Sequence, residues 1–87
     1  MYSVSHSSTV EKQISKLHPN DQRKVIKAID KLPSLFSTSQ FVPQLKKLTG
    51  EPYAWRFRVG DVRILFYQNK TLHRLEIYKV DYRGDVY

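Results

Sequence analysis

The sequence predicts an α+β fold in which an N-terminal helix hairpin packs on a small twisted antiparallel sheet, in the order β-α-α-β-β-β. Apolar residues recur at helical spacing between residues 9 and 32. After residue 53, aromatic and β-branched residues alternate with other types on both sides of Gly60-Asp61, a pair typical of two-residue hairpin turns. A chain of 87 residues is large enough for one core, so we expect a single domain over residues 1–87.

The N-terminal part predicts one short strand and two helices. Residues 2–5 alternate large and small side chains, which is compatible with a first strand. Ser8 and Glu11 have the spacing of a capping box, so a helix is expected from about Thr9 to Leu17. Pro19 breaks that helix, and a second helix capped by Asn20 should run to about residue 32.

The middle of the chain predicts a loop followed by a short basic turn. Residues 33–43 are rich in Ser, Thr, Gln and Pro, with Leu35, Phe36 and Phe41 as the expected anchors on the core. In residues 44–50, Lys46 and Lys47 should face water, and Gly50 should end the turn.

The hairpin around Gly60-Asp61 fixes an expected register. Val59 should face Val62, Arg58 should face Arg63, and Arg56 should face Leu65. A second tight turn at Asn69-Lys70 should lead into a third strand over residues 71–80. That strand would pair Leu75 with Ile64 and Ile77 with Val62, and it would bring Glu76 beside Arg63 as a cross-strand salt-bridge partner.

Cations collect on one face of this predicted sheet. Side chains alternate between the two faces, so Arg56, Arg58 and Arg63 share the face opposite the core. Arg58 and Arg63 should lie directly opposite each other, and the repulsion between their charges destabilises the fold unless the long side chains separate in water or an anionic ligand binds between them. Tyrosines and further polar groups should join the same face: Tyr67, Arg74, Glu76 and Tyr78. Guanidinium groups and phenol rings together suit single-stranded RNA or DNA.

The net positive charge favours an anionic partner but does not identify its class. Fifteen Lys and Arg against eight Asp and Glu give a net charge of +7, which favours nucleic acid, an anionic membrane or an acidic protein. There is no Cys, and the three His are far apart in the sequence, so we expect no metal and no cofactor. No apolar run approaches the roughly twenty residues of a membrane span, so a soluble cytoplasmic protein without membrane contacts is expected.

The motifs R-x-R-x-G-D-x-R (residues 56–63) and R-x-D-V-Y (residues 83–87), with the helix hairpin before them, resemble the RelE/ParE superfamily of toxins from type II toxin–antitoxin systems. The resemblance extends over nearly the whole chain. It implies a RelE-like fold and a cognate antitoxin that wraps the toxin, acidic and partly disordered when free. In the RelE branch it implies ribosome-dependent cleavage of mRNA, and in the ParE branch inhibition of DNA gyrase.

Carried over residue by residue, the resemblance implies catalytic roles for Arg63, Arg83 and Tyr87. It matches Arg56 and Arg58 to basic family positions, which we expect to bind the substrate. We expect Lys46, Lys47 and Tyr82 to bind the substrate as well. Two positions depart from the family: Tyr82 stands where many relatives have His, and Asp81 stands where RelE has a further Arg. The chemistry that follows is attack of a ribose 2′-OH on the adjacent phosphate, with arginines stabilising the phosphorane charge.

We favour the mRNA endoribonuclease, with mRNA and the ribosome as partners besides the antitoxin. A ParE-like gyrase inhibitor without nuclease activity shares the fold and much of the first motif, so it stays open at this point. A relative without activity that only binds an antitoxin or nucleic acid is the third alternative.

Overall fold

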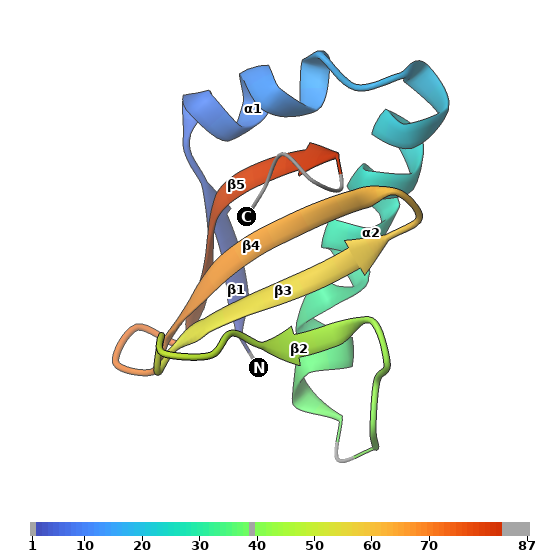
Figure 1. Ribbon diagram of the computed structural model, residues 1–87. Coiled ribbons are helices and arrows are strands. Elements are labelled where there is room, and N and C mark those ends of the chain that lie inside the picture. The colour runs from blue at the N-terminus through green and yellow to red at the C-terminus, as the bar shows by residue number, and fades with distance from the viewer. Residues whose placement is uncertain (1, 39, 83–87) are drawn as a thin grey trace.

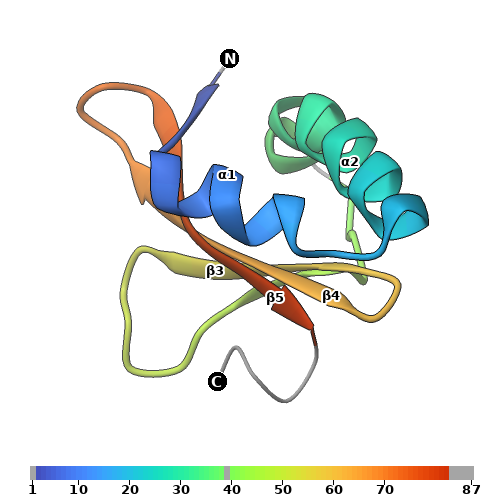
Figure 2. The ribbon, with the colours of Figure 1, turned by 90° about the horizontal axis from the view of Figure 1, so that it is seen from above.

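The computed structural model describes residues 2–38 and 40–82 and has two layers. The elements follow in the order β1 (Ser3–His6), α1 (Ser8–Ser15), α2 (Pro19–Ser37), β2 (Leu45–Lys47), β3 (Ala54–Val59), β4 (Val62–Asn69) and β5 (Arg74–Tyr82). The helices form one layer and the strands form a five-stranded sheet in the order β1-β5-β4-β3-β2 (Figure 1). Both helices lie on the same face of the sheet (Figure 2). The predicted α+β class is confirmed.

The predicted first strand is also confirmed, and it forms one edge of the sheet. It pairs parallel with β5, while the other neighbouring strands are antiparallel. Beyond the short β1, helix α1 takes over this edge, because the Gln13 side chain accepts a hydrogen bond from the backbone N–H of Val80 at 2.8 Å. The backbone N–H of Val80, which has no strand partner at this edge, therefore finds its hydrogen-bond acceptor in helix α1.

The central hairpin has the predicted register. Val59 pairs with Val62, Arg58 with Arg63, and so on to Ala54 with Tyr67. Gly60 has φ of 59°, and Asp61 does not have a positive φ, which is the pattern of a type II′ turn. This turn matches the twist of the two strands, so the Gly-Asp pair sets their register.

The predicted register between β4 and β5 is wrong. The chain turns over residues 70–73, with His73 at a φ of 51°, and β5 begins only at Arg74. A bulge opposite Leu65 and Phe66 then shifts the pairing by one residue. As a result Arg63 faces Asp81, and Glu76 faces Tyr67 and forms an ion pair with Arg74 at 3.9 Å. The expected pair between Glu76 and Arg63 does not form.

The helix boundaries differ from the predicted ones. Helix α1 is capped by Ser7 rather than Ser8, with the Ser7 hydroxyl accepting from the N–H of Val10. Helix α2 starts at Pro19, where the ring of His18 accepts from Asn20. It continues through Pro33 to Ser37, although a loop was predicted there.

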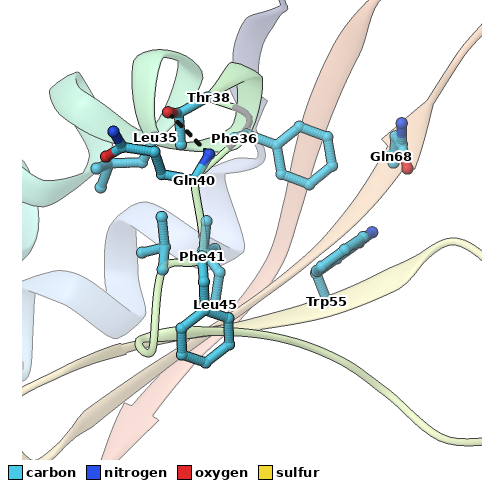
Figure 3. Close-up of a pocket in the computed structure, with 9 residues that line it drawn as sticks. Leu35, Phe36, Thr38, Gln40, Phe41, Leu45, Trp55 and Gln68 are labelled. Atoms are coloured by element: carbon cyan, nitrogen blue, oxygen red, sulfur yellow. Dashed lines mark hydrogen bonds between the residues drawn. The ribbon is translucent and has the colours of Figure 1, made fainter.

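Aromatic packing explains why α2 continues past the proline. The ring of Phe36 makes edge contacts with Trp55 at 5.0 Å, Tyr2 at 5.5 Å and Phe66 at 5.7 Å between ring centroids. Each such contact adds to the burial of apolar area. Leu35 and Phe36 thus anchor on the core as predicted, whereas Phe41, the third predicted anchor, is 86% exposed at the mouth of an apolar hollow (Figure 3).

The basic segment after this hollow is a strand and not the predicted turn. Leu45, Lys46 and Lys47 pair with Phe57, Arg56 and Trp55 of β3. Gly50 has φ of 82° and reverses the chain after β2.

The core lies between the helix layer and the sheet. Val10, Val25 and Leu32 from the helices meet Ile64 and Phe66 of β4, and all five are fully buried. Within the part of the chain that the structure describes, no helix is long and apolar enough to cross a membrane. The helices cover one face of the sheet, so any site on the sheet lies on the other.

Candidate nucleic-acid interface

The face of the sheet away from the helices carries four of the six predicted site residues that the structure describes, and we call it the outer face. Residues paired across neighbouring strands point to the same face, so the register defines its members. They are Ser3 and Ser5 of β1, Lys46 of β2, Ala54, Arg56 and Arg58 of β3, Arg63, Leu65, Tyr67 and Asn69 of β4, and Arg74, Glu76, Tyr78, Lys79 and Asp81 of β5.

Arg63 lies at the centre of the cationic end of the outer face. The residue is only 5% exposed, and it lies opposite Arg58 on one side and Asp81 on the other. Its Nη1 donates to the carbonyl oxygens of Gly60 at 3.3 Å and Val62 at 3.4 Å. Its Nε has no hydrogen-bond partner among the described residues. A buried guanidinium with spare donors is suited to hold an anion.

Arg56, Arg58 and Lys46 surround this position with further positive charge. Lys46 pairs with Arg56 because β2 is a strand, so the structure brings the two predicted substrate-binding residues together. The Nε of Arg56 is buried without a partner in the described part of the chain, and Arg58 is exposed. Within residues 2–38 and 40–82, an ion pair joins Arg74 to Glu76 and a hydrogen bond joins His6 to Glu11, and neither includes these cations.

A shallow pocket opens beside the hairpin turn. It is lined by Gln44, Arg58, Gly60, Asp61 and Arg63. Two guanidinium groups at one hollow offer donors to a phosphate, because each can bind two of its oxygens at once. Among the residues described, no group of three His, Cys, Asp or Glu could hold a metal ion.

Two of the predicted substrate-binding residues do not lie on the outer face. Lys47 pairs with Trp55, whose ring packs against Phe36 on the helix side of the sheet. Tyr82 pairs with Val62 and is likewise directed to the helix side.

The Tyr82 hydroxyl joins β5 to the turn between the two helices. It accepts from the N–H of His18 at 2.8 Å and donates to the Asp21 carboxylate at 2.9 Å. The His18 bond by itself lowers the pKa of Tyr82, but burial and the hydrogen bond to Asp21 outweigh it, so the pKa lies above the usual value of a tyrosine. The hydroxyl is therefore protonated at neutral pH and fixes the last described residue of the chain.

Arg83 and Tyr87, the other two predicted catalytic residues, lie outside the described residues. Their roles remain predictions from the resemblance.

The bulge adds Lys79 to the outer face, where the sequence did not predict it, beside Tyr78, which was predicted there. Lys79 pairs with Leu65 and adds a cation beside Arg63 and Asp81. Tyr78, the extra residue of the bulge, stacks on Tyr67 with ring centroids 4.4 Å apart and planes at 21°. Burial, followed by the neighbouring Tyr67, raises the pKa of Tyr78 above its usual value. The spacing of Leu75, Ile77 and Val80, which changes from two to three, was the signal in the sequence that could have revealed the bulge.

Fold and face together define a class: a small basic α+β domain with helices on one side of its sheet and an open cationic face on the other. Solved structures show which fold of that class it is. The RelBE2 toxin–antitoxin complex from Mycobacterium tuberculosis aligns at a TM-score of 0.76 with 23% identity over 94% of this chain and 98% of that one. The archaeal RelE–RelB complex from Pyrococcus horikoshii OT3 aligns at 0.75 with 26% identity over 95% and 96%.

The isolated RelE toxin of E. coli aligns at a TM-score of 0.74, with 16% identity over 100% of this chain and 92% of that one. No protein-family model and no curated protein sequence matches the chain. The resemblance to the RelE/ParE superfamily is confirmed at the level of structure: this protein has the RelE toxin fold.

Proposed function

We propose that this protein is the toxin of a type II toxin–antitoxin system and that it cleaves mRNA on the ribosome. The observation that carries the proposal is the buried Arg63, which faces Arg58 on the open side of a RelE fold and has an unpartnered Nε among the described residues. A phosphate of the substrate would compensate both the buried charge and the repulsion between the facing arginines. Ribosomes hold the proposed substrate, so the proposed place of action is the cytoplasm.

The proposed reaction is a transesterification within the RNA strand. The ribose 2′-hydroxyl gives up its proton as its oxygen attacks the adjacent phosphorus, the bond from phosphorus to the 5′-oxygen breaks, and the 5′-oxygen takes up a proton. The products are a 2′,3′-cyclic phosphate and a 5′-hydroxyl. Arg63 and Arg83 stabilise the negative charge of the phosphorane, and Arg56 holds the backbone with Lys46 beside it. Tyr87 assists the proton transfer or stacks on a base.

Few groups suffice for this reaction because the ribosome would orient the mRNA. Holding the 2′-oxygen in line with the leaving oxygen removes a large part of the barrier. The hydrogen bonds of the Tyr82 hydroxyl to Asp21 and His18 support a structural role for this residue rather than the substrate contact that we expected from the sequence.

The test is a translating extract primed with a reporter mRNA, followed by primer extension. We expect site-specific, ribosome-dependent breaks with the wild type, and a decrease of about 100-fold to 1,000-fold in rate for Arg63→Ala and for Arg83→Ala, since each removes a transition-state donor. Lys24→Ala is the matched control, because Lys24 is an exposed cation of α2 on the helix layer. Intact mRNA together with gyrase-linked DNA breaks would overturn the proposal in favour of a ParE-like inhibitor.

We further propose an acidic cognate antitoxin as partner. The M. tuberculosis and P. horikoshii neighbours were crystallised as RelB–RelE type complexes. The net charge of +7 gives the same kind of partner a physical basis here. A protein chain that is disordered when free can follow a curved cationic surface as it folds. A pull-down in which an acidic protein encoded next to this gene fails to bind would count against the pairing.

A further inference from the structure

The outer face has a second end, where exposed tyrosines lie. A hollow of about 400 Å³ opens there between the turn before β3 and the turn after β4. We call it the tyrosine pocket; it is lined by Tyr53, Tyr67, Gln68, Asn69, Lys70, Thr71 and Glu76. We propose that the tyrosine pocket binds an unpaired nucleobase of the same RNA strand whose phosphates lie on Arg56 and Arg63. The inference rests on the proposed function, since it takes the substrate to be single-stranded RNA.

The rings of the pocket are exposed and held in place. Tyr53 is 50% exposed and Tyr67 is 40% exposed, although both have large apolar rings. Tyr78 stacks on Tyr67 and is not among the pocket residues, so it supports the Tyr67 ring from outside the pocket. A ring fixed in this way loses little conformational freedom when a base stacks on it.

The charges of the pocket favour a base over a phosphate. Lys70 is its one cation, and its Nζ lies over the ring of Tyr53 at 5.3 Å from the centroid. Glu76 is its one anion. A phosphate would meet Lys70 as the single cation lining the pocket, beside a Glu76 carboxylate that is paired with Arg74 at 3.9 Å, whereas a neutral aromatic base meets tyrosine faces and polar groups at the rim.

The position of the pocket fits a strand that also reaches the arginines. Tyr67 and Arg63 lie on β4, on the same face and separated by four residues. At about 3.4 Å per residue this is a distance of roughly 14 Å. Stacked nucleotides advance by about 3.4 Å each, so a strand of about four nucleotides spans the two ends. The base contact would therefore set where along the strand the phosphates meet Arg63.

The experiment measures binding of a short fluorescein-labelled single-stranded RNA to the isolated protein by fluorescence anisotropy at several salt concentrations. We expect Tyr67→Ala and Tyr53→Ala each to weaken binding about tenfold, because stacking on an aromatic ring contributes strongly to the binding of a base. Their slope of log K against log salt should equal that of the wild type, since no phosphate contact is lost. Arg56→Ala should instead reduce the slope by about 1.

Two further variants serve as controls. Tyr67→Phe keeps the ring and should bind like the wild type, whereas a loss in this variant as well would assign the effect to the hydroxyl and overturn the stacking proposal. Phe41→Ala removes an exposed ring that lines the hollow at the end of α2 and should change nothing. Thermal melting of each variant checks that the fold persists, and Tyr53 lies in a turn outside the strands, where truncation disturbs the fold least.

The outcomes separate this inference from the proposed function. Wild-type affinity in both tyrosine-to-alanine variants, or no binding of free RNA by the wild type, overturns the pocket even if the protein cleaves mRNA on the ribosome. Weakened binding at unchanged salt slope supports the pocket even if the extract shows no cleavage, in which case only the nuclease proposal fails.

Discussion

Arg63 holds a positive charge where little water reaches it, and this position has a cost in stability. Arg63 is 5% exposed as a whole residue, lies between Arg58 and Asp81, and donates only to two backbone carbonyls in the described part of the chain. Removing a charge from water costs several kcal/mol unless good partners compensate, and carbonyls at 3.3 and 3.4 Å are weak ones. Under the proposed function, the residue is retained for the phosphate that it would bind.

Replacing Arg63 by an apolar side chain of similar length should therefore stabilise the protein while ending its activity. We expect Arg63→Met to raise the free energy of unfolding by about 1 kcal/mol or more, measured by chemical denaturation. The control is Arg58→Met on the facing strand, where the side chain is exposed and the change should stay within about 0.5 kcal/mol. A loss of stability in Arg63→Met would show that the carbonyl contacts outweigh the cost of burial.

At the scale of single elements, α2 contains a clear conflict between local preference and packing. Pro33 has no N–H to donate to the carbonyl of Ile29, and its ring crowds that carbonyl. The helix nevertheless runs on to Ser37, since Phe36 packs on Trp55 and Phe66. The aromatic contacts thus offset a local cost of a few kcal/mol.

Substituting this proline should remove the local cost and keep the packing. We expect Pro33→Ala to raise the free energy of unfolding by about 1–2 kcal/mol, less than the full helix-propensity difference because the unfolded chain also gains freedom. Ser34→Ala, an exposed neighbour in the same helix, should change it by no more than about 0.5 kcal/mol. Equal effects in the two variants would mean that Pro33 carries no strain.

These elements also show what the sequence could predict. The hairpin register followed from Gly60-Asp61 alone, because a two-residue turn leaves one pairing, and this register placed Arg56, Arg58 and Arg63 on one face. The path of α2 past Pro33 and the pairing of β2 depend on partners distant in the chain, which local propensity does not contain. The pairing of Arg63 with Asp81 depended on the bulge, whose only trace was the changed spacing before Val80.

At the scale of the whole molecule, positive charge is found on both layers. Among the described residues, the outer face has six cations, Lys46, Arg56, Arg58, Arg63, Arg74 and Lys79. Helix α2 adds the exposed Arg23, Lys24, Lys27 and Lys31 on the other layer. Both the outer face and the helix layer thus attract an acidic partner. The long-range electrostatic attraction should therefore depend on the net charge of the protein rather than on the cations of one face.

Because both layers are positively charged, the association rate of the proposed antitoxin should depend on the net charge, whereas its dissociation rate should depend on the surface that it contacts. Arg58→Glu and Lys24→Glu change the net charge by the same amount, so we expect both to slow association by a similar factor, of the order of two to ten at low salt. Stopped-flow mixing at low and high salt measures this rate, and the difference between the variants and the wild type should fade as salt screens the field. Dissociation should become faster in Arg58→Glu, because the outer face is the surface that the acidic chain would cover. Faster dissociation in Lys24→Glu alone would instead mean that the partner holds the helix layer and leaves the arginines of the outer face open.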